Sequence, residues 1–404
     1  MGLSKAREGN SLENRIVNSR SQALDARADD ALEALQRAGL HRTLRRVEGL
    51  QGPRMRVDGR SVLMLAGSNV LDLAGDPRVL DAAAAATREY GTAAGGARLI
   101  NGNLDLHERL ESALAAFLGC ESALLFSTGY MANLGLITSL VGPGDVVLSD
   151  AFNHASIIDA CRLSGAEKRV FAHNDATDLE RHARELAPDS FTLLVLDGVY
   201  SMDGDCARLS ELVPVAREYG MTVMLDDVHG LGVLGKSGRG TAELEGVEVD
   251  LLVGNLGKAL GSFGAFVGCS SRVRELLINR ARSFIFTCGP APGPVGAALR
   301  ALEIAQAEPE RRESLLLRSE QLRAGLRDAG YDTGASTTHV VPAIVGSNER
   351  AMQLCEQALE HGVYAQGIRY PSVPENAARL RFTPMCSHSA GEIETAVEIF
   401  RDLR

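Results

Sequence analysis

The sequence predicts an α/β protein: one large, doubly wound, mainly parallel sheet domain followed by a smaller α+β C-terminal domain. Apolar, β-branched runs alternate with stretches of helical periodicity through the middle of the chain, which is typical of a parallel sheet covered by helices on both faces. The 404 residues are 45% hydrophobic and 23% charged, a composition that can bury a large core. From about residue 296 the alternation gives way to a long helical stretch followed by short strands.

The N-terminal part predicts an arm. Residues 1 to about 20 are polar and predict a loose tail, and SQALDARADDALEALQRAG predicts an amphipathic helix that ends at Gly39. QGPRMRVDGRSVLML then predicts a small hairpin. We therefore expect an N-terminal arm and helix at 1–55, a large domain at 56–295 and a small C-terminal domain at 296–404.

Six strands are predicted for the large domain, each bounded by glycine or by a helix-like stretch. They are SALLFS at 122, DVVLSD at 145, FTLLVLDGV at 191, MTVMLDD at 221, LLVGNL at 251 and GAFVGCS at 264. In the C-terminal domain, VGAALRALEIAQAEPERRESLLLRSEQLRAGLRDAG predicts one long helix, and HVVPAIVG and RLRFTP predict short strands.

The net charge and the cysteine content exclude several classes of binding partner and site. The net charge of -10 gives no basic footprint for nucleic acid or for an anionic membrane surface. The 7 cysteines contain no CxxC pair, so neither a disulfide framework nor a zinc site is indicated. No apolar stretch reaches the roughly 18 residues of a membrane span, and the N-terminus lacks a signal-peptide core. We expect a cytoplasmic enzyme that acts on small molecules.

Polar residues follow the strand in MTVMLDDVHGLGVLGKSGRG. Asp226 and His229 come at its carboxyl end, where α/β folds bind ligands. The three glycines Gly230, Gly232 and Gly235 also match the dinucleotide fingerprint GxGxxG, but the following KSGRG is loop material, whereas the fingerprint needs a helix to begin there. A dinucleotide site is therefore the less favoured interpretation.

Lys258 lies in a glycine-flanked loop between the two apolar strands of LLVGNLGKALGSFGAFVG. This loop follows a strand end and so shares the sheet edge with Asp226 and His229. A partly desolvated lysine has a lowered basicity and forms a Schiff base with a carbonyl cofactor. The alternative is an ordinary exposed loop lysine.

Two further segments pass from a strand into a helix. Ser127, Thr128, Gly129 and Tyr130 expose free backbone N–H groups at a helix start, which is either a phosphate site or simply a capped helix. In LSDAFNHASIIDA, His154 directly follows a strand, where it either stacks on a flat ring or is an ordinary surface residue.

The order of these motifs resembles the α-oxoamine synthase family, which are pyridoxal-phosphate (PLP) enzymes of fold type I with an aspartate aminotransferase-like fold. The resemblance runs from about Leu40 to the C-terminus, and the AHND at 172–175 and the QGPR start are most similar to the amino-oxononanoate synthase branch. It is carried by QGPRMRVDG, GARLINGNLDLHERLE, LLFSTGYMAN, SDAFNHASIIDA, GVYSMDGD, DDVHGLGVLGKSGRG, NLGKALGSFGAFV and IRYPSVPENAARLRFTP.

The resemblance implies a set of residues around the cofactor ring. Lys258 matches the Schiff-base lysine, and Asp226 matches the carboxylate that pairs with the pyridinium nitrogen and keeps the ring an electron sink. His229 matches the residue that bonds the phenolate oxygen, Ser201 a second polar contact near it, and His154 the imidazole stacked on the ring.

The resemblance also implies contacts to phosphate and substrate. Gly129 and Tyr130 match the backbone turn near the phosphate, and Asn255 stands where the family has a phosphate-binding threonine. Arg381 matches the arginine that fixes the amino-acid carboxylate by bidentate hydrogen bonds. Ser372 matches a threonine that contacts substrate.

Three further positions depart from the family pattern. Ser68, in LAGSNVLDLA, replaces the asparagine of SNNYLGL at the mouth of the active site. Thr287 begins the Thr-Cys-Gly that replaces a Ser-Thr pair supplied to the phosphate of the neighbouring subunit, so the resemblance implies a homodimer with shared active sites. Ala97, in GARLINGN, lacks the hydroxyl that glycine-specific relatives carry, which predicts space for a small substrate side chain.

The expected activity is that of a PLP-dependent acyltransferase. It joins a small α-amino acid, L-alanine before serine or glycine, to an acyl thioester on coenzyme A or a carrier protein, and it releases an α-aminoketone, thiol and CO2. Two alternatives are another fold type I PLP enzyme, such as an aminotransferase or a carbon–carbon lyase, and a catalytically inactive subunit.

Overall fold

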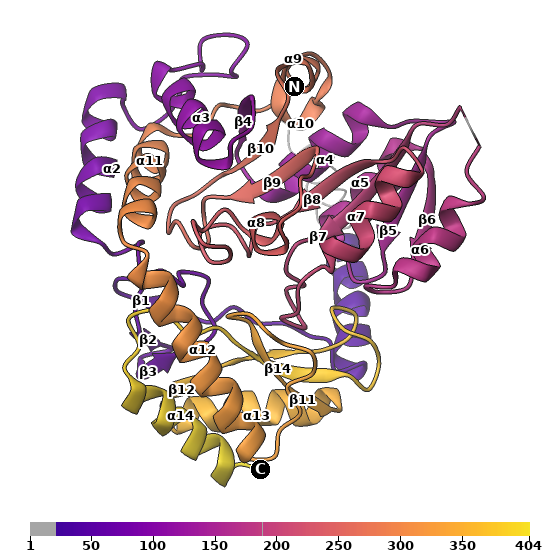
Figure 1. Cartoon of the computed structure of the whole chain (residues 1–404). Coiled ribbons are helices and arrows are strands. Elements are labelled where there is room, and N and C mark those ends of the chain that lie inside the picture. The colour runs from indigo at the N-terminus through magenta and orange to yellow at the C-terminus, as the bar shows by residue number, and fades with distance from the viewer. Residues whose placement is uncertain (1–21, 188) are drawn as a thin grey trace, which may run out of the picture.

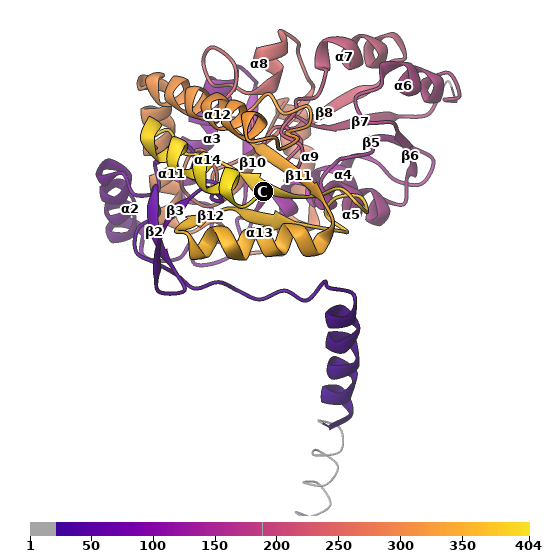
Figure 2. The same cartoon turned by 90° about the horizontal axis from the view of Figure 1, so that it is seen from below.

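The computed structural model describes residues 22–187 and 189–404, so the tail predicted at residues 1 to about 20 lies outside the described residues. Figure 1 shows a large sheet with its helices in the upper part and the C-terminal elements below it. Residues 22–37 form the predicted N-terminal helix, and all of them are exposed. Figure 2 shows this helix standing away from both layers. Within the described ranges, no helix is long and apolar enough to cross a membrane.

The central sheet has seven strands in the order β4-β10-β9-β8-β7-β5-β6. They are β4 (Ser122–Phe126), β5 (Val146–Asp150), β6 (Glu167–Phe171), β7 (Thr192–Asp197), β8 (Thr222–Asp226), β9 (Leu251–Asn255) and β10 (Ala265–Cys269). All neighbours pair in parallel except β10, which is antiparallel to both β4 and β9. The six predicted strands are confirmed. The seventh, β6, was not predicted, because its sequence EKRVF is charged and only Phe171 is buried, as is usual at a sheet edge.

Helices cover both faces of this sheet, as its doubly wound pattern predicts (Figure 1). Along β7, Leu193 and Val195 face one core cluster while Leu194 and Leu196 face another, because successive side chains of a strand point to opposite faces. The helices of this domain are α2 (Pro77–Tyr90), α3 (Asp105–Leu118), α4 (Gly129–Leu140), α5 (Ala155–Ser164), α6 (Ala176–Ala183), α7 (Leu209–Glu218), α8 (Thr241–Glu245), α9 (Ser271–Arg280) and α10 (Arg282–Ile285).

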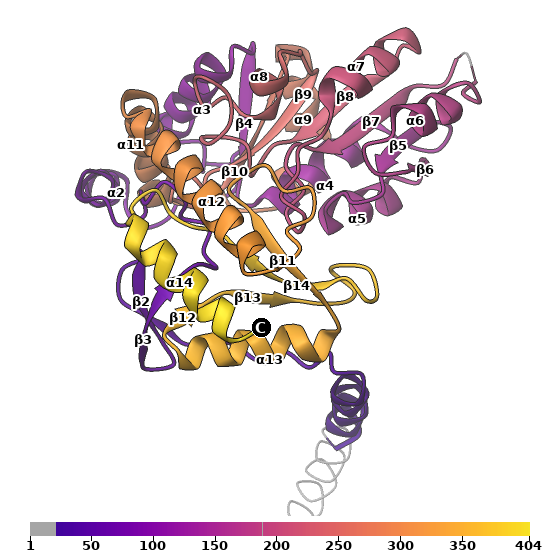
Figure 3. The ribbon, with the colours of Figure 1, turned by 60° about the horizontal axis from the view of Figure 1, so that its bottom comes forward.

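The long C-terminal helix that was predicted as one is two helices, α11 (Pro292–Ala307) and α12 (Glu310–Asp328). The break falls at Pro309, which has no N–H to donate and so ends the hydrogen-bond ladder of the first helix. Beyond α12, the antiparallel sheet β11-β14-β13 lies against α12, α13 and α14 (Figure 3). Their bounds are β11 (Val341–Gly346), α13 (Asn348–Glu360), β13 (Gln366–Ile368), β14 (Ala378–Phe382) and α14 (Ala390–Asp402).

The predicted N-terminal hairpin is present as β2 (Arg54–Val57) and β3 (Arg60–Met64), and each of its strands has one further partner. β1 (Val47–Glu48) pairs with β2, and β3 pairs in parallel with β12 (Val363–Tyr364) of the C-terminal region. The boundary expected at residue 56 falls within β2, and the pairing of β3 with β12 joins the hairpin to the C-terminal layer. The local pattern predicts the hairpin but carries no information on so distant a partner strand.

A buried ion cluster fixes α3 against the edge of the large sheet. Glu111 accepts hydrogen bonds from Arg98 at 2.9 Å and from Arg274 at 3.0 Å, and also from the backbone N–H of Leu125 in β4 at 2.9 Å. The side chains of Arg98 and Glu111 are only 4% and 5% exposed. Removing one partner of such a pair leaves the other charge buried without compensation.

We therefore predict that Glu111→Ala lowers the free energy of unfolding by about 3–5 kcal/mol, the usual effect of breaking a buried ion pair. Arg109→Ala, at an exposed position of the same helix, is the control and should change it by less than about 0.5 kcal/mol. Urea unfolding followed by circular dichroism measures both. Equal effects of the two substitutions would contradict this role of Glu111.

Candidate active site

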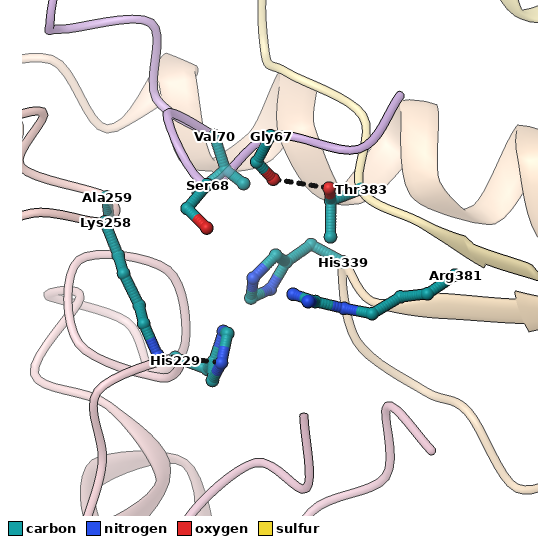
Figure 4. A pocket seen from close by; sticks show the side chains of 9 residues that line it. All are labelled: Gly67, Ser68, Val70, His229, Lys258, Ala259, His339, Arg381 and Thr383. Atoms are coloured by element: carbon teal, nitrogen blue, oxygen red, sulfur yellow. Dashed lines mark hydrogen bonds between the residues drawn. The ribbon is translucent and has the colours of Figure 1, made fainter. Parts of the chain in front are cut away.

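A cavity lies between the carboxyl edge of the large sheet and the C-terminal sheet. It is lined by Gly67, Ser68, Val70, His229, Lys258, Ala259, His339, Arg381 and Thr383. Figure 4 shows Lys258 reaching to His229 on one side, with Arg381 and His339 on the other and Ser68 near Val70. Both layers of the fold thus contribute side chains to one site.

Lys258 follows β9, and its Nζ lies 2.8 Å from His229 Nε2. Burial lowers the pKa of Lys258, the charge of Asp226 opposes this shift and that of Arg381 adds to it, and the resulting pKa is about 8. Burial, followed by the charges of Lys258 and Arg381, holds the pKa of His229 well below its usual range, so this imidazole is neutral. Lys258 is therefore the desolvated lysine of the sequence analysis rather than an exposed loop residue, and part of it is a free amine near neutral pH.

Asp226 ends β8 and is 4% exposed. Its Oδ2 accepts a hydrogen bond of 2.6 Å from Asn133 Nδ2, which also lies 2.9 Å from Ser156 Oγ. Asn133, on α4, lies within the LLFSTGYMAN motif but was not singled out from the sequence. Its amide keeps the buried carboxylate hydrogen-bonded while the charge of Asp226 acts on Lys258.

His154 is the N-cap of α5, and its Nδ1 accepts from the backbone N–H of Ser156. Burial lowers the pKa of His154, while the charge of Asp226 raises it and that of Lys258 lowers it. All three side chains are therefore close enough to interact. The neighbouring Asn153 is buried and donates to Val195 O at 2.7 Å, which pins the turn before His154 to the sheet.

Asp197, at the end of β7, was not predicted as a site residue. It lies opposite Asp226 in the register of the two strands, is 5% exposed, and its Oδ1 has no hydrogen-bond partner. Burial and then the charge of Asp226 raise the pKa of Asp197 well above its usual range. Its signal in the sequence was its position at a strand end, directly before the GVYSMDGD segment.

The start of α4 has the geometry of an anion site. Gly129 is its first residue, and the Thr128 side chain caps it by accepting from Met131 N–H at 3.2 Å. Asn255 Oδ1 accepts from Gly257 N–H, and its Nδ2 lies 3.3 Å from where a Cβ on Gly129 would stand. A side-chain donor thus faces a helix N-terminus, which favours a phosphate group.

The other predicted residues lie outside the Lys258 cavity. Tyr130 turns its hydroxyl to the carboxylate of Asp159, so only its backbone belongs to the start of α4. Ser201 and Ser372 line a second cavity together with Asn153.

Ala97 and Thr287 are on adjoining segments: Ala97 forms a backbone bridge with Cys288, and Gly289 N–H donates to Gly96 O at 2.9 Å. Neither Ala97 nor Thr287 is among the residues that line the Lys258 cavity of the same chain. Within one chain the structure therefore does not bring these two predicted site residues to Lys258.

The dinucleotide interpretation is wrong. The segment from Gly230 continues as turns and bends until α8 begins at Thr241, so no helix starts among the fingerprint glycines. Asp227, beside Asp226, holds this loop instead: its carboxylate accepts hydrogen bonds from the backbone N–H and the hydroxyl of Thr241.

Within the described part of the chain, two groups in the cavity each have a buried nitrogen without a hydrogen-bond partner. Burial lowers the pKa of Arg381 to about 10, and its Nε has no hydrogen-bond partner. His339, which the sequence analysis missed, is 2% exposed with an unpartnered Nδ1, and burial, followed by Arg381, lowers its pKa to about 3. A guanidinium without an acidic partner in a closed site is suited to bind a carboxylate.

Residues 60–400 match the family of class I and II aminotransferases. The chain belongs to this family. It is 49% identical to the 8-amino-7-oxononanoate synthase of Geobacter sulfurreducens over 91% of this chain and 95% of that protein. The serine palmitoyltransferase of Sphingomonas wittichii has a TM-score of 0.88 at 34% identity, covering 95% of this chain and 97% of that one. The Sphingomonas paucimobilis enzyme, solved with a bound PLP–myriocin aldimine, also has a TM-score of 0.88, at 32% identity over the same shares.

These relatives confirm the predicted family, fold and cofactor: the chain is a PLP-dependent α-oxoamine synthase of fold type I. The residues of the synthase fit PLP at three separate points. Lys258 offers an amine to the aldehyde, Asp226 a carboxylate to the ring nitrogen, and the start of α4 with Asn255 offers donors to the phosphate.

We predict that the rate at which apo-synthase combines with PLP rises with pH and is half-maximal near pH 8, because only the neutral amine of Lys258 attacks the aldehyde. Arg381→Gln removes a nearby cation and should move this midpoint to higher pH, whereas Arg401→Gln, at an exposed position of α14, should leave it in place. Stopped-flow absorbance between pH 6 and 10 measures the rate. A midpoint near 10.5 in the unsubstituted protein, the value for an ordinary lysine, would contradict the account.

Proposed function

We propose that this synthase condenses L-alanine with an acyl thioester and releases an α-aminoketone, the free thiol and CO2. The observation that carries the proposal is the opposition of two groups across one cavity. A lysine with a lowered pKa stands on one side, and a guanidinium without an acidic partner stands on the other. The first is suited to move a proton and the second to hold a carboxylate.

The amino acid is held by its carboxylate. Arg381 binds that group with a planar fork of donors, and the neutral His339 beside it adds a ring nitrogen that needs a hydrogen-bond partner. This anchoring directs the α-carbon to Lys258. Bound PLP supplies an electron sink for the pair of electrons that remains when the α-proton leaves.

Lys258 removes the α-proton. Its pKa of about 8 leaves a useful fraction of free amine at neutral pH, and a base is most efficient when its pKa lies near the working pH. His229 holds Nζ at 2.8 Å and remains neutral, so it orients the amine without adding a second positive charge. The charge of Asp226 raises the pKa of Lys258 and so opposes the effect of burial.

The condensation then joins the α-carbon to the acyl group. The α-carbon attacks the thioester carbonyl, a carbon–carbon bond forms, the carbon–sulfur bond breaks, and the thiolate leaves with its electron pair and takes up a proton from solvent. The bond from the α-carbon to the carboxylate breaks next, its electron pair stays with the α-carbon, and the carboxylate leaves Arg381 as CO2. Lys258 returns a proton to the α-carbon, and the aminoketone is released.

The choice of L-alanine rests on two supports. An 8-amino-7-oxononanoate chain carries its amine beside a terminal methyl group, which is the fragment that L-alanine leaves after losing CO2, and relatives of that name are 42–49% identical to this chain. Ala97 is also small. Because Ala97 and Thr287 lie away from the Lys258 cavity of their own chain, the proposal includes a homodimer in which each subunit lends them to the site of the other.

We predict that kcat/KM for L-alanine exceeds that for glycine by roughly ten- to a hundredfold, with L-serine intermediate, since one methyl group in an apolar pocket is worth about 1–3 kcal/mol. Thiol release with a single accepted acyl thioester measures all three amino acids. A kcat/KM for glycine equal to or above that for L-alanine would contradict a pocket that favours the methyl group. Amino transfer to an oxo acid without thiol release would show an aminotransferase instead.

We predict that two inactive variants restore activity when mixed. Lys258→Ala lacks the base, and Thr287→Arg places bulk where the partner subunit's phosphate would bind. Co-refolded heterodimers contain one site in which Lys258 and Thr287 are both intact, so thiol release should return to about a quarter of the wild-type level. If each chain formed its site alone, the mixture would stay as inactive as its components, and the shared-site proposal would be lost.

A further inference from the structure

His173 forms a charged bridge that the proposed chemistry does not use. It follows β6 and lies between two carboxylates: Nδ1 is 3.0 Å from Asp150 Oδ1, and Nε2 is 2.9 Å from Asp205 Oδ2. We propose that His173 is a positioning residue, an imidazolium that holds together the turn at 150–154 and the turn at 200–205.

The first turn, residues 150–154, is held through Asp150. The side chain of Asp150 is fully buried, and its Oδ1 also accepts from Phe152 N–H at 2.8 Å. The ring of Phe152 stacks on His173, with centroids 4.3 Å apart and planes 19° apart. His173 therefore fixes both the backbone and the aromatic ring of the turn that ends in His154.

The second turn, residues 200–205, is held through Asp205. Tyr200 N–H donates to Asp205 O at 3.0 Å and closes the turn, while the Tyr200 ring meets His173 edge-on at 4.3 Å. Asn174 Nδ2 donates at 3.1 Å to Asp205 Oδ2, the carboxylate oxygen that faces His173 Nε2. Ser201 lies inside this turn, and residues of both turns line one cavity.

The geometry requires the charged form of the ring. Both ring nitrogens face carboxylate oxygens, and only a protonated imidazole can donate from both; a neutral ring would turn a lone pair toward one carboxylate. Burial alone would lower the pKa of His173, but the hydrogen bonds to Asp150 and Asp205 outweigh it and raise the pKa to about 9.

Few other titratable groups face this ring. Tyr200 is buried without a partner for its hydroxyl, and burial, then Asp150, raises its pKa well above the usual range, so it stays neutral. Asp203 of the second turn is paired with Arg379 of β14.

The sign of the pH dependence follows. The folded chain binds the His173 proton more tightly than the unfolded chain, whose imidazole has a pKa of about 6.5. The stabilisation is therefore complete below pH of about 6.5, declines above it, and is lost as the pH rises through about 9. Without the bridge, the turns that carry His154 and Ser201 would no longer be held in place. PLP would then bind more weakly.

The test compares His173→Gln with the control His361→Gln, at an exposed position after α13. We expect His173→Gln to weaken PLP binding, measured by absorbance titration at pH 7, by about ten- to a hundredfold, the effect of losing a charged hydrogen bond. The bound PLP spectrum should shift as well. The melting temperature of the His173→Gln apo-protein should lie below that of wild type at pH 6.5 and equal it by pH 10. The His361→Gln control should change neither PLP affinity, nor the spectrum, nor the melting temperature.

Asp205→Asn supplies the second arm and replaces the first if His173→Gln does not fold. Alone it should also weaken PLP binding, and in the His173→Gln background it should add little, because the two substitutions break one bridge. Wild-type PLP affinity and spectrum in the single variants, or a stability difference that is constant with pH, would overturn the proposal. PLP binding is measured without any thioester, so this outcome is distinct from a failure of the proposed condensation.

Discussion

The confinement of two cationic side chains in one cavity is the constraint on which the rest of the site depends. Lys258 and Arg381 line the same cavity; burial disfavours both charges, and the charge of Arg381 further disfavours that of Lys258. Lys258 is the group that loses its proton, because an ammonium gives up its proton far more easily than a guanidinium does. The result is an amine that is partly neutral near pH 7, opposite a permanent cation. A proton transfer on an amino acid held by its carboxylate needs both groups.

The fold creates this confinement by bringing two sheets together. The parallel strands β8 and β9 end at one edge, where Asp226 and the Lys258 loop emerge, and β14 of the C-terminal layer carries Arg381 to the opposite wall. The N-terminal segment around Ser68 completes the cavity, and its hairpin is joined to the C-terminal layer through β12. A substrate bound here therefore contacts both layers of the molecule.

The sequence predicted what depends on local pattern and missed what depends on distant partners. Apolar runs predict six strands, but the charged edge strand that ends at Phe171 has no such run. The helical periodicity continues across Pro309, so the pattern predicts one helix where the proline separates two. The motifs located Lys258, whereas Asn133 went unnoticed because its value lies in one hydrogen bond to a strand far along the chain. Ala97 shows the same limit, since it does not line the Lys258 cavity of its own chain, which no local pattern reveals.

Exchange of the α-proton of L-alanine with solvent deuterium tests the central claim most directly, because it isolates the proton transfer assigned to Lys258. The account predicts exchange by the PLP-loaded protein in the absence of thioester, followed by NMR, with a rate that rises as the pH approaches about 8. It also predicts a loss of at least a thousandfold in Lys258→Ala, in keeping with about 10²–10⁴-fold from a general base and the further loss of the covalent link to the cofactor. Exchange at the wild-type rate in Lys258→Ala would contradict the account.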